Sequence, residues 1–88
     1  MQIEFPLGET NDERRWVVWF LAVVHGKQIT CGISYQALRT HFGADFHDPL
    51  PAFIANRQRI EQCTATLISQ GHFEADETIV IRAHDMEK

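Results

Sequence analysis

The side chains with the most chemical capacity in this sequence are five histidines and two cysteines. They are His25, His41, His47, His72 and His84, together with Cys31 and Cys63. The histidines form no i, i+4 pair and no H-E-x-x-H motif, and the cysteines have neither C-x-x-C nor zinc-ligand spacing. No phosphate-binding loop, dinucleotide glycine pattern or G-x-S-x-G motif occurs. We therefore expect no metal site and no cofactor, and we assign no catalytic residue.

Both cysteines are expected to lie in the core as reduced thiols, because a cysteine outside a disulfide or metal site behaves as a small hydrophobe. Cys31 falls on the apolar face of a predicted strand, and Cys63 lies near the edge of an apolar helix face. Burial in apolar surroundings disfavours the thiolate that a nucleophile needs. The sequence therefore favours a non-catalytic protein, although whether it is an enzyme stays open.

Arg57 is the remaining residue with clear chemical potential, because it lies on the apolar face of a predicted helix. The other members of that face are Phe53, Ile60, Thr64, Leu67 and Ile68. Breaking a buried ion pair costs on the order of 3–5 kcal/mol, so the guanidinium should find a partner. One interpretation pairs it with Glu61, one turn on, or with a backbone carbonyl. In the other, Arg57 and its neighbour Asn56 bind an acidic group of an unknown protein partner, which suits the planar fork of arginine.

The composition is that of one small domain, which we assign to residues 1–88. A chain of 88 residues supports a single core, and 44% hydrophobic with 23% charged residues is ordinary for a folded protein. The net charge of −4 disfavours a broad phosphate-binding surface. Arg14 and Arg15 do lie next to Trp16 and near Trp19, but Trp16 is expected to face the core. A nucleic-acid partner is therefore not favoured.

The sequence contains neither a signal-peptide pattern nor an apolar run long enough to cross a membrane, which bears on where the protein is located. Residues 1–15 do not have the basic-then-apolar order of a signal peptide. The longest apolar run, residues 16–24, is far shorter than the roughly 20 residues that cross a bilayer. We expect a cytoplasmic protein without a membrane partner.

The predicted elements occur in the order β-β-β-α-α-β. Strands are expected over residues 2–5, 16–24, 28–33 and 78–84, helices over 35–42 and 51–70, and loops over 8–13 and 45–50. Ser34 is a good N-cap for the first helix, and Gly43 suits its C-terminal end. Pro51 suits the first turn of the second helix, which should end at Gly71. Runs of strands and then helices indicate an α+β fold, with a mainly antiparallel sheet and two helices packed on one face.

The second and third strands should form a hairpin through His25-Gly26, because glycine supplies the positive φ of a tight turn. The face that should take the helices is then Val18, Phe20, Ala22, Ile29, Cys31 and Ile33. The opposite face carries Val17, Trp19, Leu21 and Val23 against Gln28, Thr30 and Gly32.

Half of that second face is apolar, and monomers seldom expose a contiguous apolar patch beyond roughly 300–600 Å². Either the segment around Ile3 and Phe5 folds back over the patch, or a second copy of the chain covers it. We predict a homodimer through Val17, Trp19, Leu21 and Val23.

Several local patterns occur along the chain in one order. They are Val24-His25-Gly26-Lys27-Gln28-Ile29-Thr30-Cys31, Ile33-Ser34-x-x-Ala37-Leu38, His41-Phe42-Gly43 and Phe53-x-x-Asn56-Arg57-x-x-Ile60-Glu61, followed by an acidic-flanked last strand. Together they resemble the small bacterial domain-of-unknown-function family 1488, over residues 3–84. The resemblance implies a compact α+β domain with an antiparallel sheet and two helices, and it implies no activity.

Three classes of function remain. A small non-catalytic interaction or regulatory module in a bacterial cytoplasm needs only the features described so far. A basic surface patch would instead favour a nucleic-acid-associated accessory protein. A deep pocket converging on Arg57 would favour a small-molecule-binding or enzymatic domain.

Overall fold

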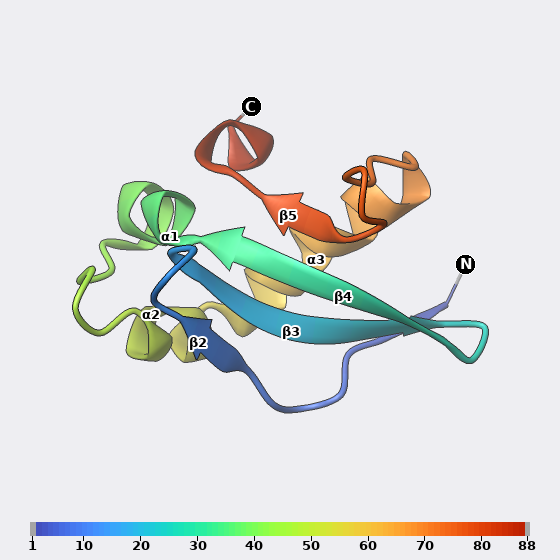
Figure 1. The fold of residues 1–88 in the computed structure, drawn as a ribbon, viewed down its shortest axis with the longest axis horizontal. Helices are drawn as coiled ribbons and strands as arrows, with labels where there is room; N and C mark the ends of the chain where they lie inside the picture. Colours follow the sequence, from blue (N-terminus) through green and yellow to red (C-terminus); the bar gives the residue numbers. More distant parts are fainter. Residues whose placement is uncertain (1, 88) are drawn as a thin grey trace.

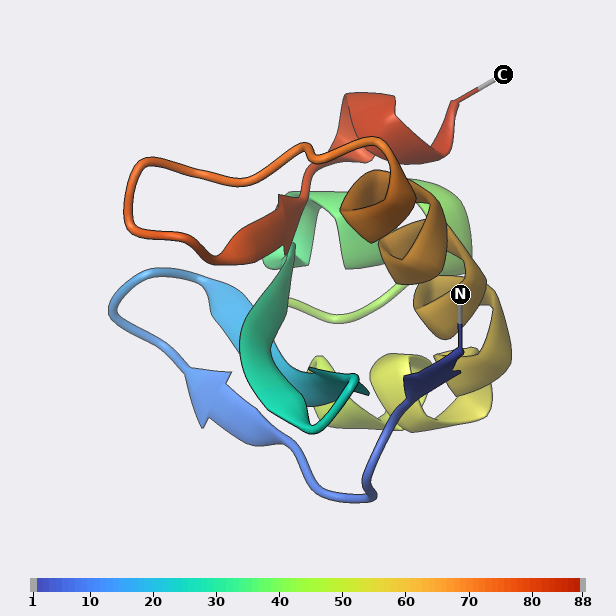
Figure 2. The same cartoon turned by 90° about the vertical axis from the view of Figure 1, so that its right-hand side faces the viewer.

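The computed structural model describes residues 2–87, in which helices cover one side of a five-stranded sheet (Figures 1 and 2). The elements in chain order are β1 (Ile3–Glu4), β2 (Thr10–Asp12), β3 (Val17–Val24), β4 (Lys27–Ser34), α1 (Tyr35–Phe42), α2 (Leu50–Ala55), α3 (Arg57–Ser69), β5 (Ile79–Ile81) and a 3-10 helix, η1 (Ala83–Met86). The sheet order is β1-β3-β4-β5, and β2 also pairs with β3. The predicted α+β fold is confirmed.

The hairpin of β3 and β4 has the predicted register. His25 and Gly26 form its two-residue turn with φ of 52° and 79°, and positive φ at both positions is what a type I′ turn requires. Phe20 pairs with Cys31 and Ala22 with Ile29, so these side chains share the face toward the helices. Every residue predicted for that face is at most 8% exposed.

The core lies between this face of the sheet and the helices. Leu38 of α1, Phe53 of α2 and Ile60 of α3 are fully buried there, and the rings of Phe20 and Phe53 lie 5.4 Å apart. Burying side chains of this size contributes roughly 1.5–3 kcal/mol each. Figure 2 shows α1, α2 and α3 on this side, so no α-helix of residues 2–87 lies over the opposite face of the sheet.

The predicted loop over residues 8–13 is wrong in its middle, because Thr10–Asp12 forms β2 and pairs with the first half of β3. β1 pairs with the second half of β3 along the same edge. The hydroxyl of Tyr35 donates a hydrogen bond to the side chain of Asn11 and fixes β2 from the helix side. A polar triplet without apolar alternation gives no strand signal, so only the free edge of β3 makes it a strand.

The first predicted helix is confirmed, and α1 has the predicted bounds. The Ser34 hydroxyl accepts a hydrogen bond from the Ala37 N–H at 3.0 Å, and Gly43 ends the helix with a φ of 67°. The single helix predicted over 51–70 is wrong. Asn56 leaves helical geometry with φ −118° and ψ 21°, and the chain turns there from α2 into α3.

The last strand is shorter than the predicted span of 78–84. Only Ile79–Ile81 pairs with the sheet, and a bond from the Arg82 N–H to the Asp85 carboxylate starts η1 directly afterwards. This strand runs parallel to β4, with Cys31 opposite Ile79, because the chain returns through all three helices. The sheet is therefore mixed, with antiparallel pairing among β1 to β4 and one parallel pair at its other edge.

Candidate interaction surfaces

Arg57 is the first residue of α3, and its side chain is 14% exposed. Its Nε donates to Glu61 at 2.8 Å, one NH group pairs with Glu9 at 3.3 Å, and the other donates to the Pro6 carbonyl at 2.7 Å. The guanidinium carbon also lies 5.4 Å from the centre of the Phe53 ring. The prediction that Arg57 is mostly buried and bonded to an acid or a carbonyl is confirmed.

Two of these contacts, with Glu9 and Pro6, come from the segment between β1 and β2. The sequence predicted Glu61 or a backbone carbonyl as the partner of Arg57, because a side chain one turn away is visible in a helical pattern. A contact with Glu9 across 48 residues is not visible there. The neighbouring Asn56 side chain donates to the Ala52 carbonyl at 2.8 Å. Both residues of the predicted partner-binding pair are therefore bonded within the chain, and Arg57 ties the N-terminal segment to the start of α3.

The predicted self-association residues lie together on the helix-free face of β3. Val17 is 8% exposed, and Trp19, Leu21 and Val23 are half-buried. The Trp19 ring lies against Gly32 of β4, where a Cβ atom would come within 2.7 Å of the ring and 2.6 Å of Val17. The indole N–H donates to the Asp12 carboxylate at 3.0 Å. Trp19 is thus held flat on the sheet by its neighbours.

The N-terminal segment does not cover this face in the expected way. Ile3 and Phe5 pack against the core cluster, and the Phe5 ring lies 6.5 Å from Phe20 on the opposite face of the sheet. The alternative in which Ile3 or Phe5 packs on Trp19 is therefore wrong. Leu7 lies on the helix-free side instead, where it lines a hollow of about 360 Å³ together with Trp19 and Leu21, and it is 90% exposed.

A second hollow, of about 400 Å³, borders Trp19 on the side of β5. Its lining includes the apolar residues Val17 and Val80 and the charged residues Arg15 and Arg82. Arg82 is bonded through both NH groups to Glu74, at 3.0 and 3.3 Å. The helix-free face is thus an apolar stripe with charged residues at one side.

Trp16 does not face the core, contrary to the sequence prediction. It is 56% exposed and takes a φ of 59°, which turns its side chain out of the strand direction. Its ring stacks on Tyr35 at 6.2 Å and meets the edge of Phe46 at 5.4 Å. The apolar run over 16–24 gave no sign of this, because a positive φ in a tryptophan has no sequence signature.

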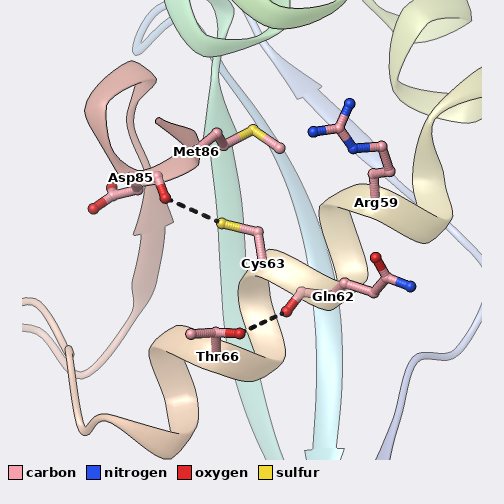
Figure 3. A pocket seen from close by; sticks show the side chains of 6 residues that line it. All are labelled: Arg59, Gln62, Cys63, Thr66, Asp85 and Met86. Atoms are coloured by element: carbon pink, nitrogen blue, oxygen red, sulfur yellow. Dashed lines mark hydrogen bonds between the residues drawn. The ribbon is translucent and has the colours of Figure 1, made fainter. Parts of the chain in front are cut away.

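The two cysteines differ in their surroundings. Cys31 is fully buried, as predicted, and burial raises the pKa of its thiol to about 12. Cys63 is only partly buried and lines a hollow of about 320 Å³ between α3 and η1 (Figure 3). Its sulfur lies 3.7 Å from the Asp85 carbonyl oxygen. The prediction of an inward-facing thiol is therefore right for Cys31 and only partly right for Cys63.

The carboxylate side chain in the hollow beside Cys63 belongs to Asp85. The Asp85 carboxylate already accepts from the Arg82 N–H at 2.8 Å and lies 3.4 Å from His84. Among residues 2–87, no three histidine, cysteine or carboxylate side chains lie together as a metal site requires. No helix within that range has the length and hydrophobicity to span a membrane.

The chain is similar in sequence and in fold to bacterial proteins of unknown function. The chain is 36% identical over 69 residues to the uncharacterized protein YrdB of Escherichia coli, an alignment that covers 77% of this chain and 81% of the relative, and the Shigella flexneri protein of the same name gives the same values. A crystal structure of a DUF1488 protein of unknown function from Shewanella loihica superposes with a TM-score of 0.81 and 26% identity, covering 90% of each chain. The family described as "Protein of unknown function (DUF1488)" matches residues 3–81, and the chain belongs to that family.

Proposed function

We propose that this protein is a small non-catalytic interaction module of the cytoplasm that self-associates through the helix-free face of its sheet. The observation that carries the proposal is the stripe of Val17, Trp19, Leu21 and Val23, which has no helix above it. Trp19, Leu21 and Val23 keep part of their apolar surface exposed, whereas Val17 is buried. Contiguous exposed apolar surface is usually covered in a soluble protein, and a symmetric pair of chains is the commonest arrangement that covers it.

Two further features support a second copy as the occupant. Leu7 projects at the rim of the hollow that Leu21 also lines, so each copy offers both an exposed apolar side chain and a recess beside it. The Arg57 guanidinium is already bonded within the chain, so it is a weaker candidate for binding a partner than the apolar face. A self-complementary surface is what a two-fold interface requires.

Sedimentation equilibrium at micromolar concentration tests this proposal. The wild-type chain should sediment at twice its mass of 10.2 kDa, and Leu21→Glu should sediment at that single mass with unchanged circular dichroism. Leu21 is a better position for this substitution than Trp19, because Trp19 bonds to Asp12 and packs on Gly32, so replacing it would also disturb the fold.

Ile54→Glu is the matched control, because Ile54 is an aliphatic residue on α2 that is 57% exposed on the helix side of the molecule. It should dimerise as the wild type does. A monomeric wild type at these concentrations, or equal effects of the two substitutions, would refute self-association through this face.

A further inference from the structure

The strand β4 extends well beyond the strand that pairs with its outer edge. β4 covers Lys27–Ser34, but β5 pairs only with Cys31, Gly32 and Ile33. Figure 1 shows the hairpin end of β3 and β4 projecting past β5. Within the described part of the chain, no strand lies opposite residues 28–30 on this edge.

The hairpin turn fixes which backbone groups face that open edge. In a two-residue turn the N–H of the residue after the turn bonds back across it, so the Lys27 N–H faces β3. Successive residues of a strand direct their N–H and C=O to alternate edges, so Gln28 and Thr30 direct theirs away from β3. Gly32 is next in this alternation and lies at the middle of the pairing with β5, as expected. The Gln28 N–H and C=O are thus placed to pair with an added strand.

A hollow of about 490 Å³ lies along the same edge. One wall is formed by residues 27–30 of β4, and the other by Phe73 and residues 76–78 of the loop that leads into β5. Ile29 is 8% exposed, and Phe73 is 43% exposed. A strand added at Gln28 would therefore have backbone partners and a recess lined mostly by polar residues, in which Phe73 offers an exposed apolar ring.

The loop wall of this hollow carries two carboxylates, Asp76 and Glu77, against the single positive charge of Lys27. The Thr78 hydroxyl and N–H donate to Asp76 at 2.7 and 3.2 Å and hold the pKa of that carboxyl below its ordinary value. The wall therefore stays negative at neutral pH. An incoming segment with a lysine or arginine at this point complements it.

We propose that the open edge of β4 binds an extended segment of a partner protein by strand addition, with backbone pairing at Gln28 and a basic side chain beside Asp76 and Glu77. Natural proteins usually block an exposed edge with proline, a bulge or inward charges, and Gln28-Ile29-Thr30 has none of these. Strand addition uses the backbone edge of β4, whereas self-association uses the helix-free face, which Gln28 and Thr30 border.

Selection from a phage-displayed library of random twelve-residue peptides on the full chain tests the proposal. The enriched peptides should combine alternating β-branched residues with a lysine or arginine. Gln28→Pro should weaken the binding of synthetic copies of these peptides by roughly tenfold or more, because proline removes the outward N–H and leaves the pairing with β3 in place. Gln28→Ala keeps the N–H and should change binding by less than about threefold.

Two further measurements complete the test. Addition of a selected peptide should protect the Gln28 amide of the wild-type chain from hydrogen exchange, which gives a result even if Gln28→Pro does not fold. Asp76→Asn combined with Glu77→Gln should weaken binding of the basic peptides, and Leu21→Glu should not. A library without enriched peptides, or peptides that bind Gln28→Pro as well as Gln28→Ala, would overturn strand addition at this edge.

Discussion

Replacing Arg57 tests how the N-terminal segment is held to the helices. Arg57→Ala removes the bonds to Glu61, Glu9 and the Pro6 carbonyl and the contact with Phe53. Each ion pair is partly exposed, with carboxylate side chains 25% accessible, so we assign each about 0.5 kcal/mol. The charged bond to Pro6 contributes about 1.5 kcal/mol and the ring contact about 0.5 kcal/mol. These guanidinium contacts sum to about 3 kcal/mol, and the lost packing of the apolar stem adds about 1 kcal/mol, so the expected loss in the free energy of unfolding is about 4 kcal/mol.

Arg57→Met separates the charge from the packing. Methionine keeps most of the apolar stem on the ring of Phe53 and removes the guanidinium, and the two carboxylates can be hydrated where they lie. We expect its loss to be smaller than that of Arg57→Ala by about 1 kcal/mol, roughly the burial of one or two methylene groups.

Urea unfolding followed by far-ultraviolet circular dichroism measures these losses in the free energy of unfolding. The dependence of that free energy on urea concentration should be the same for all variants. Arg59→Ala is the matched control, because Arg59 lies in the same turn of α3 and its guanidinium rests over Phe42 at 5.5 Å on an exposed surface. Its expected loss is below about 1 kcal/mol. Equal losses for Arg57→Ala and Arg59→Ala would refute the argument, and equal losses for Arg57→Ala and Arg57→Met would show that packing of the stem contributes nothing.

Two other predictions follow from the sheet. Gly32→Ala should lower the free energy of unfolding by about 1–3 kcal/mol in urea titrations, because its Cβ would overlap Val17 and Trp19; a loss below about 0.5 kcal/mol would contradict this packing. In a Cys63→Ser background, Cys31 should react with a thiol reagent only after denaturant is added, and its raised pKa predicts a loss of stability as the pH rises above about 9, where only the unfolded thiol ionises. Adding Cys31→Val to that background should reduce this pH dependence, and rapid labelling of the native thiol would contradict its burial.

Local signals predicted much of this fold. His25-Gly26 set the register of β3 and β4, and Ser34 and Gly43 set both ends of α1, because turns and caps depend on residues a few positions apart. The internal pairing of Arg57 also followed from its place in an apolar pattern. The hairpin turn and the ends of α1 are decided by neighbours in the sequence, whereas Arg57 also bonds to Glu9 and Pro6 in a distant segment.

The features that the sequence did not predict are decided by distant parts of the chain. Asn56 interrupts a helix whose apolar spacing continues from Phe53 to Ile60, so periodicity conceals the break. Thr10–Asp12 becomes a strand only because β3 has a free edge there, and the direction of β5 depends on the path through the helices. The exposure of Trp16 depends on one backbone angle. The site proposed at β4 was invisible for the same reason, since it exists only because β5 is short.

The parallel pairing of β4 with β5 has a consequence for synthesis of the chain. Everything from α1 to the end of α3 lies between the two paired strands, so closing this pair is a long-range step with a high entropic cost. β1 to β4 are made before the three helices and can pair with one another without them, whereas Ile79–Ile81 follows the helices in the chain. Until β5 pairs, the whole outer edge of β4 is uncovered, so the incompletely folded chain can pair with a neighbouring chain along this strand.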